Sequence, residues 1–235
     1  MISIIFPIKC IKCRCFINEQ NNEYTCNKCF KLITIKKSFE CVGCKRSIKL
    51  GETCLLCRRS NYLDQLLIAS DYTNPLLAKL IKIFKYNFIY DVRGQIFLIT
   101  KKYLNWMIKN KKYDPFSEEP LVIPVPLHKR RLNFRGFNQS EIMASLIADN
   151  YGLMMRSDVL LKTKKSKSQA DIKEREERLE NIAGVFKVVD QEKIKGRVVL
   201  LIDDICTTGA TLNECARVLK ESGATKVIAL VVARG

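Results

Sequence analysis

The segment that most constrains the fold is residues 198–212, which read VVLLIDDICTTGATL. An uninterrupted apolar run, typical of a parallel strand buried on both faces, leads into Asp203 and Asp204 at the expected carboxyl end. Apolar residues then recur at helical spacing over 211–222, and a second apolar run covers 226–232. The pattern predicts a strand-helix-strand unit, and hence an α/β protein with a parallel sheet flanked by helices.

This unit also predicts a ribose-phosphate site. Ligands of open α/β sheets bind at the carboxyl ends of strands. There Asp203 and Asp204 would accept hydrogen bonds from the two vicinal hydroxyls of a ribose. The helix N-terminus would attract a phosphate through free N–H groups and the helix dipole. The expected phosphate-binding residues are small or carry a hydroxyl group: Thr207, Thr208, Gly209, Ala210 and Thr211.

Nucleotide-binding motifs of other classes do not fit this segment. The chain has no GxxxxGK[ST] sequence, which argues against a P-loop, and no GxGxxG follows a strand. A purely structural turn would not account for an acid pair and a hydroxyl-rich loop occurring together. The segment resembles the motif of type I phosphoribosyltransferases that binds 5-phosphoribosyl 1-pyrophosphate (PRPP). The resemblance implies displacement at the anomeric carbon, with Asp203 and Asp204 as catalytic-site residues and Mg²⁺ bound with PRPP.

Nine of the 11 cysteines lie in the first 57 residues, and eight of these form four CxxC pairs. Two such pairs provide four thiolates, the ligand set of a closed structural Zn²⁺ site, so eight ligands predict two Zn²⁺ ions. Sequential pairing is the simplest arrangement, although a cross-braced arrangement of alternate pairs is open, and Cys15 is left unassigned. No secretory signal supports a disulfide-rich alternative. The expected ligands are Cys10, Cys13, Cys26, Cys29, Cys41, Cys44, Cys54 and Cys57.

The 235 residues carry a formal net charge of +17, which favours anionic partners such as nucleic acid, phosphorylated metabolites or a membrane surface. A lysine-rich proteome would also account for part of this charge. No apolar run is long enough to span a membrane. We expect a cysteine-rich double zinc ribbon over 1–60, a helical hood or linker over 61–115 and a phosphoribosyltransferase-like domain over 116–235.

Two helices are expected in the middle segment, over 74–85 and 92–110, covering the edge of the sheet. Residues 121–125 then form the expected first core strand. Four cations follow around Phe134 and Phe137, a composition typical of an anion or single-stranded nucleic-acid surface. His128 has no nearby histidine or carboxylate, so we interpret it as a loop or helix-capping residue rather than a metal ligand.

The stretch PVPLHKRRLNFRGFNQ matches the PVPLHxxRxxxRGFNQ signature of the ComF family, whose cytoplasmic competence proteins combine a zinc finger with a phosphoribosyltransferase-like domain. The segment 72–86, ending in Lys85 and Tyr86, also resembles that family. So do four residues of its QxxLxxxxRxxNxxxxF stretch, although Asp171 and Ile172 blur the leucine position. The glycine that often follows a zinc knuckle is replaced by Arg14 and Lys45. The family match includes Gln169, Arg178, Asn181 and Phe186.

The resemblance implies a cytoplasmic protein that handles incoming single-stranded DNA in natural transformation, beside DNA-import or recombination proteins. It also implies that Arg130, Arg131 or Arg135 faces pyrophosphate or DNA. The charged stretch 162–180 corresponds in order to a mobile lid over PRPP, although a solvated linker and helix would have the same composition. The alternatives are an active phosphoribosyltransferase of nucleotide metabolism and a regulator that responds to PRPP.

Overall fold

The computed structural model describes residues 8–17, 24–86, 90–164 and 182–235. A four-stranded sheet lies at its centre, in the order β1-β6-β5-β2, and all three neighbouring pairs are parallel. The strands are β1 (Gln65–Asp71), β2 (Leu121–Pro124), β5 (Val198–Cys206) and β6 (Lys226–Arg234). A two-stranded antiparallel sheet pairs β3 (Leu160–Lys162) with β4 (Phe186–Val188). The parallel α/β fold expected from the sequence is therefore confirmed.

The sheet begins earlier in the chain than expected. The prediction that residues 121–125 form its first core strand is wrong, because β1 precedes them and pairs in parallel with β6. β1 is almost entirely buried, as the apolar sequence QLLIASD allows for a strand covered on both faces. The segment 61–115 thus adds a strand to the sheet as well as two helices.

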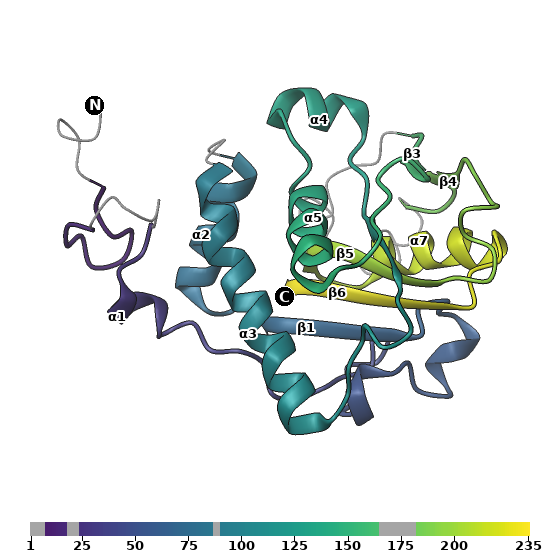
Figure 1. Ribbon diagram of the computed structural model, residues 1–235, viewed down its shortest axis with the longest axis horizontal. Coiled ribbons are helices and arrows are strands. Elements are labelled where there is room, and N and C mark those ends of the chain that lie inside the picture. Colours follow the sequence, from purple (N-terminus) through teal and green to yellow (C-terminus); the bar gives the residue numbers. More distant parts are fainter. Residues whose placement is uncertain (1–7, 18–23, 87–89, 165–181) are drawn as a thin grey trace.

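Helices cover both faces of the sheet (Figure 1). On one face lie α2 (Pro75–Tyr86), α3 (Arg93–Lys111) and α5 (Gln139–Tyr151), which share a core with alternate residues of the strands. On the other face lies α7 (Ala210–Glu221), whose buried residues pack on the remaining strand residues. α3 packs chiefly on β1, the edge strand, so this pair of helices covers one face of the sheet at that edge, where the apolar stripe of α2 is also buried.

Local signals account for the positions where α2 and α7 begin. Asn74 caps α2, since its Oδ1 accepts hydrogen bonds from the N–H groups of Leu76 and Leu77 at 3.1 Å each. Pro75 stands at the first helical position, where a missing N–H costs nothing. Gly209 precedes α7 with a φ of 87°, a left-handed conformation that favours glycine. The helix begins at Ala210, one residue before the expected range.

The remaining helical elements are short. They are α1 (Asn27–Phe30), α4 (Lys129–Arg135) and the 3₁₀ turns η2 (Lys49–Gly51), η3 (Cys57–Arg59) and η4 (Tyr90–Val92). Among the described residues, no helix is both long and apolar enough to cross a membrane.

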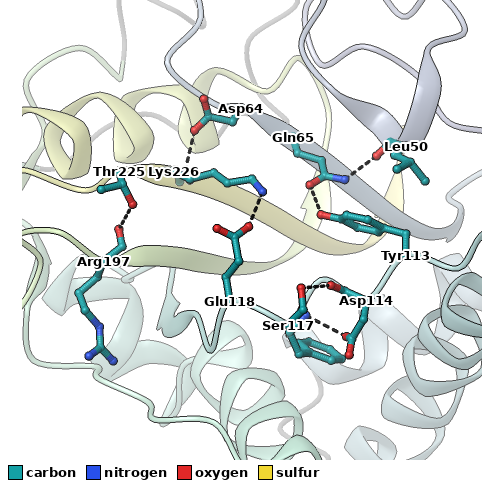
Figure 2. Close-up of polar contacts among 12 residues, drawn as sticks. Leu50, Asp64, Gln65, Tyr113, Asp114, Ser117, Glu118, Arg197, Thr225 and Lys226 are labelled. Atoms are coloured by element: carbon teal, nitrogen blue, oxygen red, sulfur yellow. Dashed lines mark hydrogen bonds and ion pairs between the residues drawn. The ribbon is translucent and has the colours of Figure 1, made fainter.

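Polar contacts fasten the amino ends of β1 and β6, as Figure 2 shows. Gln65 donates to the carbonyl of Leu50 at 2.7 Å and accepts from the hydroxyl of Tyr113 at 2.6 Å. Lys226 forms a 2.7 Å ion pair with Glu118. These contacts join the cysteine-rich segment and the chain that follows α3 to the amino ends of the strands. The carboxyl ends of the strands are left open for a site.

Candidate phosphosugar site and cysteine clusters

The candidate site lies where the chain leaves β2 and β5 on opposite faces of the sheet. β2 leads to α5 on one face, whereas β5 leads directly to α7 on the other. Neighbouring strands with such diverging connections leave a crevice beyond their carboxyl ends, the usual ligand site of open α/β sheets. A cavity of about 360 Å³ occupies this position, and it is lined by residues from α2, α4, α5, β3, β4, β5 and α7 and from the loops that follow β1, β2 and β5.

The acid pair projects into this cavity from β5. β5 pairs with β2 only as far as Ile202 but continues along β6 to Cys206, so both aspartates stand beyond the end of β2. Strand β5 is therefore longer than the expected run ending at Ile202. Asp203 Oδ1 accepts from Ser140 Oγ at 2.8 Å and from the N–H of Asp204 at 2.9 Å. The acid pair is thus held in place before any ligand binds.

Burial and charge shape the ionisation of this pair. Burial, followed by the neighbouring Asp204 carboxylate, raises the pKa of Asp203 to about 7. Asp204 Oδ1 lies 2.9 Å from Nζ of Lys85 on α2. Burial opposes the charge of Lys85, but the two carboxylates outweigh it and raise the lysine pKa. Lys85 therefore stays charged and balances one of the carboxylates.

The predicted phosphate loop follows the acid pair directly. All five of its residues, 207–211, line the cavity. The N–H of Ala210 donates to Thr208 Oγ1 at 3.3 Å, which holds the loop at the start of α7. This places a helix N-terminus, with its partial positive charge, beside the acid pair. The structure therefore brings together every residue expected to hold a ribose phosphate.

The arginines of α4 divide between two faces. Arg131 and Arg135, one helical turn apart, line the cavity, whereas Arg130 does not. The Arg135 guanidinium stacks on Tyr86, 5.1 Å from the ring centroid, and donates to Gln139 at 3.1 Å. Arg130 projects from the exposed side of the helix. The three arginines are thus close in sequence but not equivalent in space.

Two neighbours of these arginines have structural roles. His128 is the N-cap of α4, because its Nδ1 accepts from the N–H of Arg130 at 3.2 Å, which confirms the capping interpretation. Phe137 is only partly exposed and packs against Phe84, with ring centroids 5.6 Å apart, so less of its ring is available to a nucleic acid. Phe134, by contrast, is 68% exposed.

The residues by themselves did not assign Lys85 or Ser140 to the site, and Lys162 was expected there only as part of the lid over 162–180. Lys85 ends the family-like segment 72–86, and Ser140 directly follows the RGFNQ signature, so both stand beside recognisable sequence. Lys162 ends β3 and lines the cavity, where burial and the nearby Arg131 lower its pKa to about 8. Most of the lid expected over 162–180 lies outside the described residues, as do Gln169, Arg178 and Asn181.

The eight CxxC cysteines gather in two groups of four, in sequential pairing. The first cluster is Cys10, Cys13, Cys26 and Cys29, and the second is Cys41, Cys44, Cys54 and Cys57. Within each cluster the sulfur atoms lie within 4.8 Å of one another. The Sγ atoms of Cys44 and Cys54 are 3.8 Å apart, close to the edge of about 3.8 Å expected for a tetrahedron with Zn–S bonds of about 2.3 Å. Both ligand sets therefore fit Zn²⁺.

Backbone geometry supports the same interpretation of the clusters. Burial alone would raise the pKa of Cys41, yet backbone N–H groups of Cys44, Cys54 and Gly43 lower it to about 6. Arg14 and Lys45 have φ values of 64° and 60°, the left-handed conformation that a knuckle glycine would adopt. Replacing the glycine has therefore left the turn intact. Cys15 lies beside the first cluster, with its Sγ 3.3 Å from that of Cys13.

Comparisons with known proteins agree with this geometry. The phosphoribosyl transferase domain model matches residues 141–235, which contain the acid pair and the phosphate loop. Competence protein F of Haemophilus influenzae is 26% identical over 94% of this chain and 95% of its own. Competence protein ComFC of Bacillus subtilis is 28% identical over 85% and 78%. DNA utilization protein YhgH of Salmonella typhimurium is 26% identical over 70% and 69%.

The parallel sheet, the site at its carboxyl edge and the matching domain define a protein with a phosphoribosyltransferase-like domain. Its amino-terminal part holds two four-cysteine clusters. Relatives similar over most of its length, together with this domain, support a ComF-family protein.

Proposed function

We propose that this chain handles incoming single-stranded DNA in the cytoplasm during DNA uptake, and that its phosphoribosyltransferase-like domain binds PRPP. Relatives named for competence and for DNA utilization support the first part. The observation that carries the second part is a single cavity in which an acid pair, a phosphate loop and a group of cations meet. DNA-import or recombination proteins are the proposed protein partners.

The charges of the cavity suit PRPP, which is a polyanion. The two carboxylates would hold the ribose hydroxyls, and residues 207–211 would hold the 5-phosphate. Arg131 and Arg135 would face the pyrophosphate, together with the Mg²⁺ that accompanies it. Five cations against two aspartates line the cavity, and the excess positive charge favours such a ligand: Lys82, Lys85, Arg131, Arg135 and Lys162.

The outer face of α4 suits a nucleic-acid strand. Arg130 and Phe134 are one helical turn apart and exposed, on a helix with no buried residue. An aromatic ring can stack on a base while a cation binds the neighbouring phosphate. We therefore assign Arg130 and Phe134 to DNA, and Arg131 and Arg135 to PRPP.

Fluorescence anisotropy with labelled single-stranded and duplex oligonucleotides, across a salt series, tests this function. We expect tighter binding to the single strand, with an affinity that falls steeply as salt is added because counterions are released. Replacing both Arg130 and Phe134 with Ala should weaken single-strand binding by about tenfold or more. Binding that is absent near physiological salt would contradict the DNA role.

A matched variant separates the two binding activities. The double change Asp203→Ala, Asp204→Ala should abolish PRPP binding in calorimetry while leaving single-strand affinity unchanged. If this change weakens the binding of PRPP and of single-stranded DNA equally, the assignment of DNA and PRPP to two faces of α4 is wrong. Repeating the anisotropy series with PRPP and Mg²⁺ tests the regulatory alternative, in which PRPP changes the affinity for DNA.

An active phosphoribosyltransferase is the second candidate, because the complete phosphosugar loop has no obvious use in a pure DNA-binding module. Such enzymes work mainly by positioning reactants and stabilising the departing pyrophosphate, so they need no dedicated nucleophile. Pyrophosphate release from PRPP in the presence of nucleobases would favour this candidate.

The two cysteine clusters are proposed to hold one structural Zn²⁺ ion each. Four thiolates leave no open coordination position, so the expected contribution of the metal is folding free energy rather than catalysis. Two equivalents of zinc per chain in the purified protein, released by a thiol-reactive reagent, would support this assignment.

A further inference from the structure

The second cysteine cluster lies directly against the phosphate loop. Val42, between Cys41 and Cys44, is 1% exposed and shares an apolar core with Ala210 at the start of α7. A Cβ added at Gly209 would come within 2.9 Å of Cγ2 of Val42. The knuckle and the loop are therefore in close contact, with no room for an extra methyl group.

A buried arginine joins the same knuckle to the sheet. Arg234, at the end of β6, is 5% exposed and donates to the carbonyls of Val42 at 2.7 Å and Cys41 at 3.3 Å. Its guanidinium is also 2.9 Å from Glu40. Arg234 pairs in register with Cys206, the residue that precedes the phosphate loop. The position of the knuckle is thus linked to the strand from which the loop departs.

The last cysteine of the cluster is linked to α7. Asn213, in the first turn of α7, accepts from the N–H of Tyr62 at 2.7 Å and donates to the carbonyl of Ser60 at 3.3 Å. The neighbouring Asn61 donates to the carbonyl of Cys57 at 2.8 Å. The phosphate loop therefore contacts the Cys41 side of the second cluster, and the first turn of α7, which follows the loop, is joined to its Cys57 side.

The first cluster makes its contacts elsewhere. Gln95 of α3 accepts from the N–H of Tyr24 at 2.9 Å and donates to Thr25 Oγ1 at 2.7 Å. Lys79 of α2 donates to the carbonyl of Ile11 at 3.1 Å. These contacts join the first cluster to α2 and α3, so it serves as an internal reference for the second.

We propose that the metal-bound second cluster is a structural part of the phosphate loop, and that Val42 is the positioning residue through which it acts. Metal binding provides much of the folding free energy of such a small module. Loss of this metal should free the knuckle, remove Val42 from its place against Gly209 and leave residues 207–211 unsupported. The inference rests on the proposed function, in which this loop binds the 5-phosphate of PRPP.

Hydrogen-deuterium exchange of the amides of residues 206–211 tests the coupling without any ligand. Cys54→Ser and Cys26→Ser form a matched pair, since both residues begin the second CxxC of their cluster and both are partly buried. Each variant should lose one zinc equivalent. Only Cys54→Ser should speed exchange in the loop, by about tenfold or more. Equal exchange of the loop in both variants would overturn the proposal.

A second pair of variants, which leaves all the cysteines in place, tests the proposal if Cys54→Ser does not fold. Val42→Ala should keep both zinc equivalents but still speed exchange in the loop, because removing two buried methyl groups leaves a gap beside Gly209. Ile11→Ala changes the same position of the first knuckle and should leave the loop unaffected. Unchanged loop exchange in Val42→Ala would overturn the role of Val42.

PRPP calorimetry on the same variants separates this inference from the proposed function. If the unmodified protein does not bind PRPP but loop exchange follows the second cluster, the coupling stands and the proposed ligand is wrong. If PRPP binds equally well to the unmodified protein and to Cys54→Ser, the coupling is wrong and the proposed ligand stands.

Discussion

Nζ of Lys85 lies 2.9 Å from Oδ1 of Asp204, so an ion pair joins α2 to the acid pair of β5 inside the cavity. The side chains of Lys85 and Asp204 are only 18% and 11% exposed, which limits screening of the pair by water. The second carboxylate, that of Asp203, relies on hydrogen bonds from Ser140 and the backbone. Lys85 is therefore the cation that directly balances the acid pair.

Replacing Lys85 with Met should destabilise the protein by about 3 kcal/mol at pH 7, because a buried carboxylate loses its counter-charge. Urea titrations at pH 7 and pH 5 would measure the effect, which should be smaller at pH 5 because Asp203, whose pKa is raised to about 7, is then protonated and no longer repels the Asp204 carboxylate. Lys82→Met is the control, since Lys82 also lines the cavity but is exposed. Equal destabilisation by the two variants would contradict the ion-pair argument.

The raised pKa of Asp203 predicts a stability that falls as pH rises. Below the usual pKa of 3.8 the carboxyl is protonated in both the folded and the unfolded protein. Between 3.8 and about 7 it ionises in the unfolded chain but stays largely protonated in the folded protein, so rising pH favours unfolding. Asp203→Asn should remove this loss, since its amide oxygen can still accept from Ser140. We expect it to be more stable than the unmodified protein by about 2 kcal/mol at pH 8, and by less at pH 5. Calorimetric unfolding at both pH values would show whether the two curves diverge.

Lys162 predicts proton uptake when an anion enters the cavity. Burial and Arg131 lower its pKa to about 8, so part of the population is neutral at pH 8. A bound polyphosphate would favour the charged form and raise the pKa. PRPP titrations at pH 8, in buffers of different ionisation enthalpy, should show uptake of a fraction of a proton that disappears in Lys162→Met. An unchanged uptake in this variant would assign the proton to another group.

The lowered pKa of Glu214 predicts that its contribution to stability changes with pH in the opposite direction to that of Asp203. Burial opposes its ionisation, but hydrogen bonds from Arg217 at 2.8 Å and from the N–H of Gly184 at 2.7 Å lower its pKa. Its stabilisation is present above the usual pKa of 4.5 and is lost as pH falls through the lowered value. Glu214→Gln should cost about 1 kcal/mol at pH 7 and much less near pH 3. Chemical unfolding at the two pH values would test this, with Glu221→Gln as an exposed control on the same arginine.

Features that depend on neighbouring residues were predictable from the sequence. The strand, the acid pair, the phosphate loop and α7 are contiguous, so periodicity and residue type were enough to define the βα turn and its chemistry. The four CxxC pairs likewise predicted two groups of thiolates, because ligand type and spacing are local properties. The sequential pairing of these groups was left open, since it depends on how separate turns fold together.

The roles of Lys85, Ser140, Val42 and β1 emerged only in the tertiary structure. Each depends on segments distant in the chain that meet because their apolar faces are buried against a common sheet. Burial of the stripe on α2 carries Lys85 to Asp204, and packing of the second knuckle carries Val42 to Gly209. The sequence by itself determined the acid pair, the predicted phosphate loop and the two groups of thiolates available for a metal. The tertiary structure decided which charge balances the acid pair and which cysteine cluster supports the loop, because both depend on packing between distant elements rather than on local spacing.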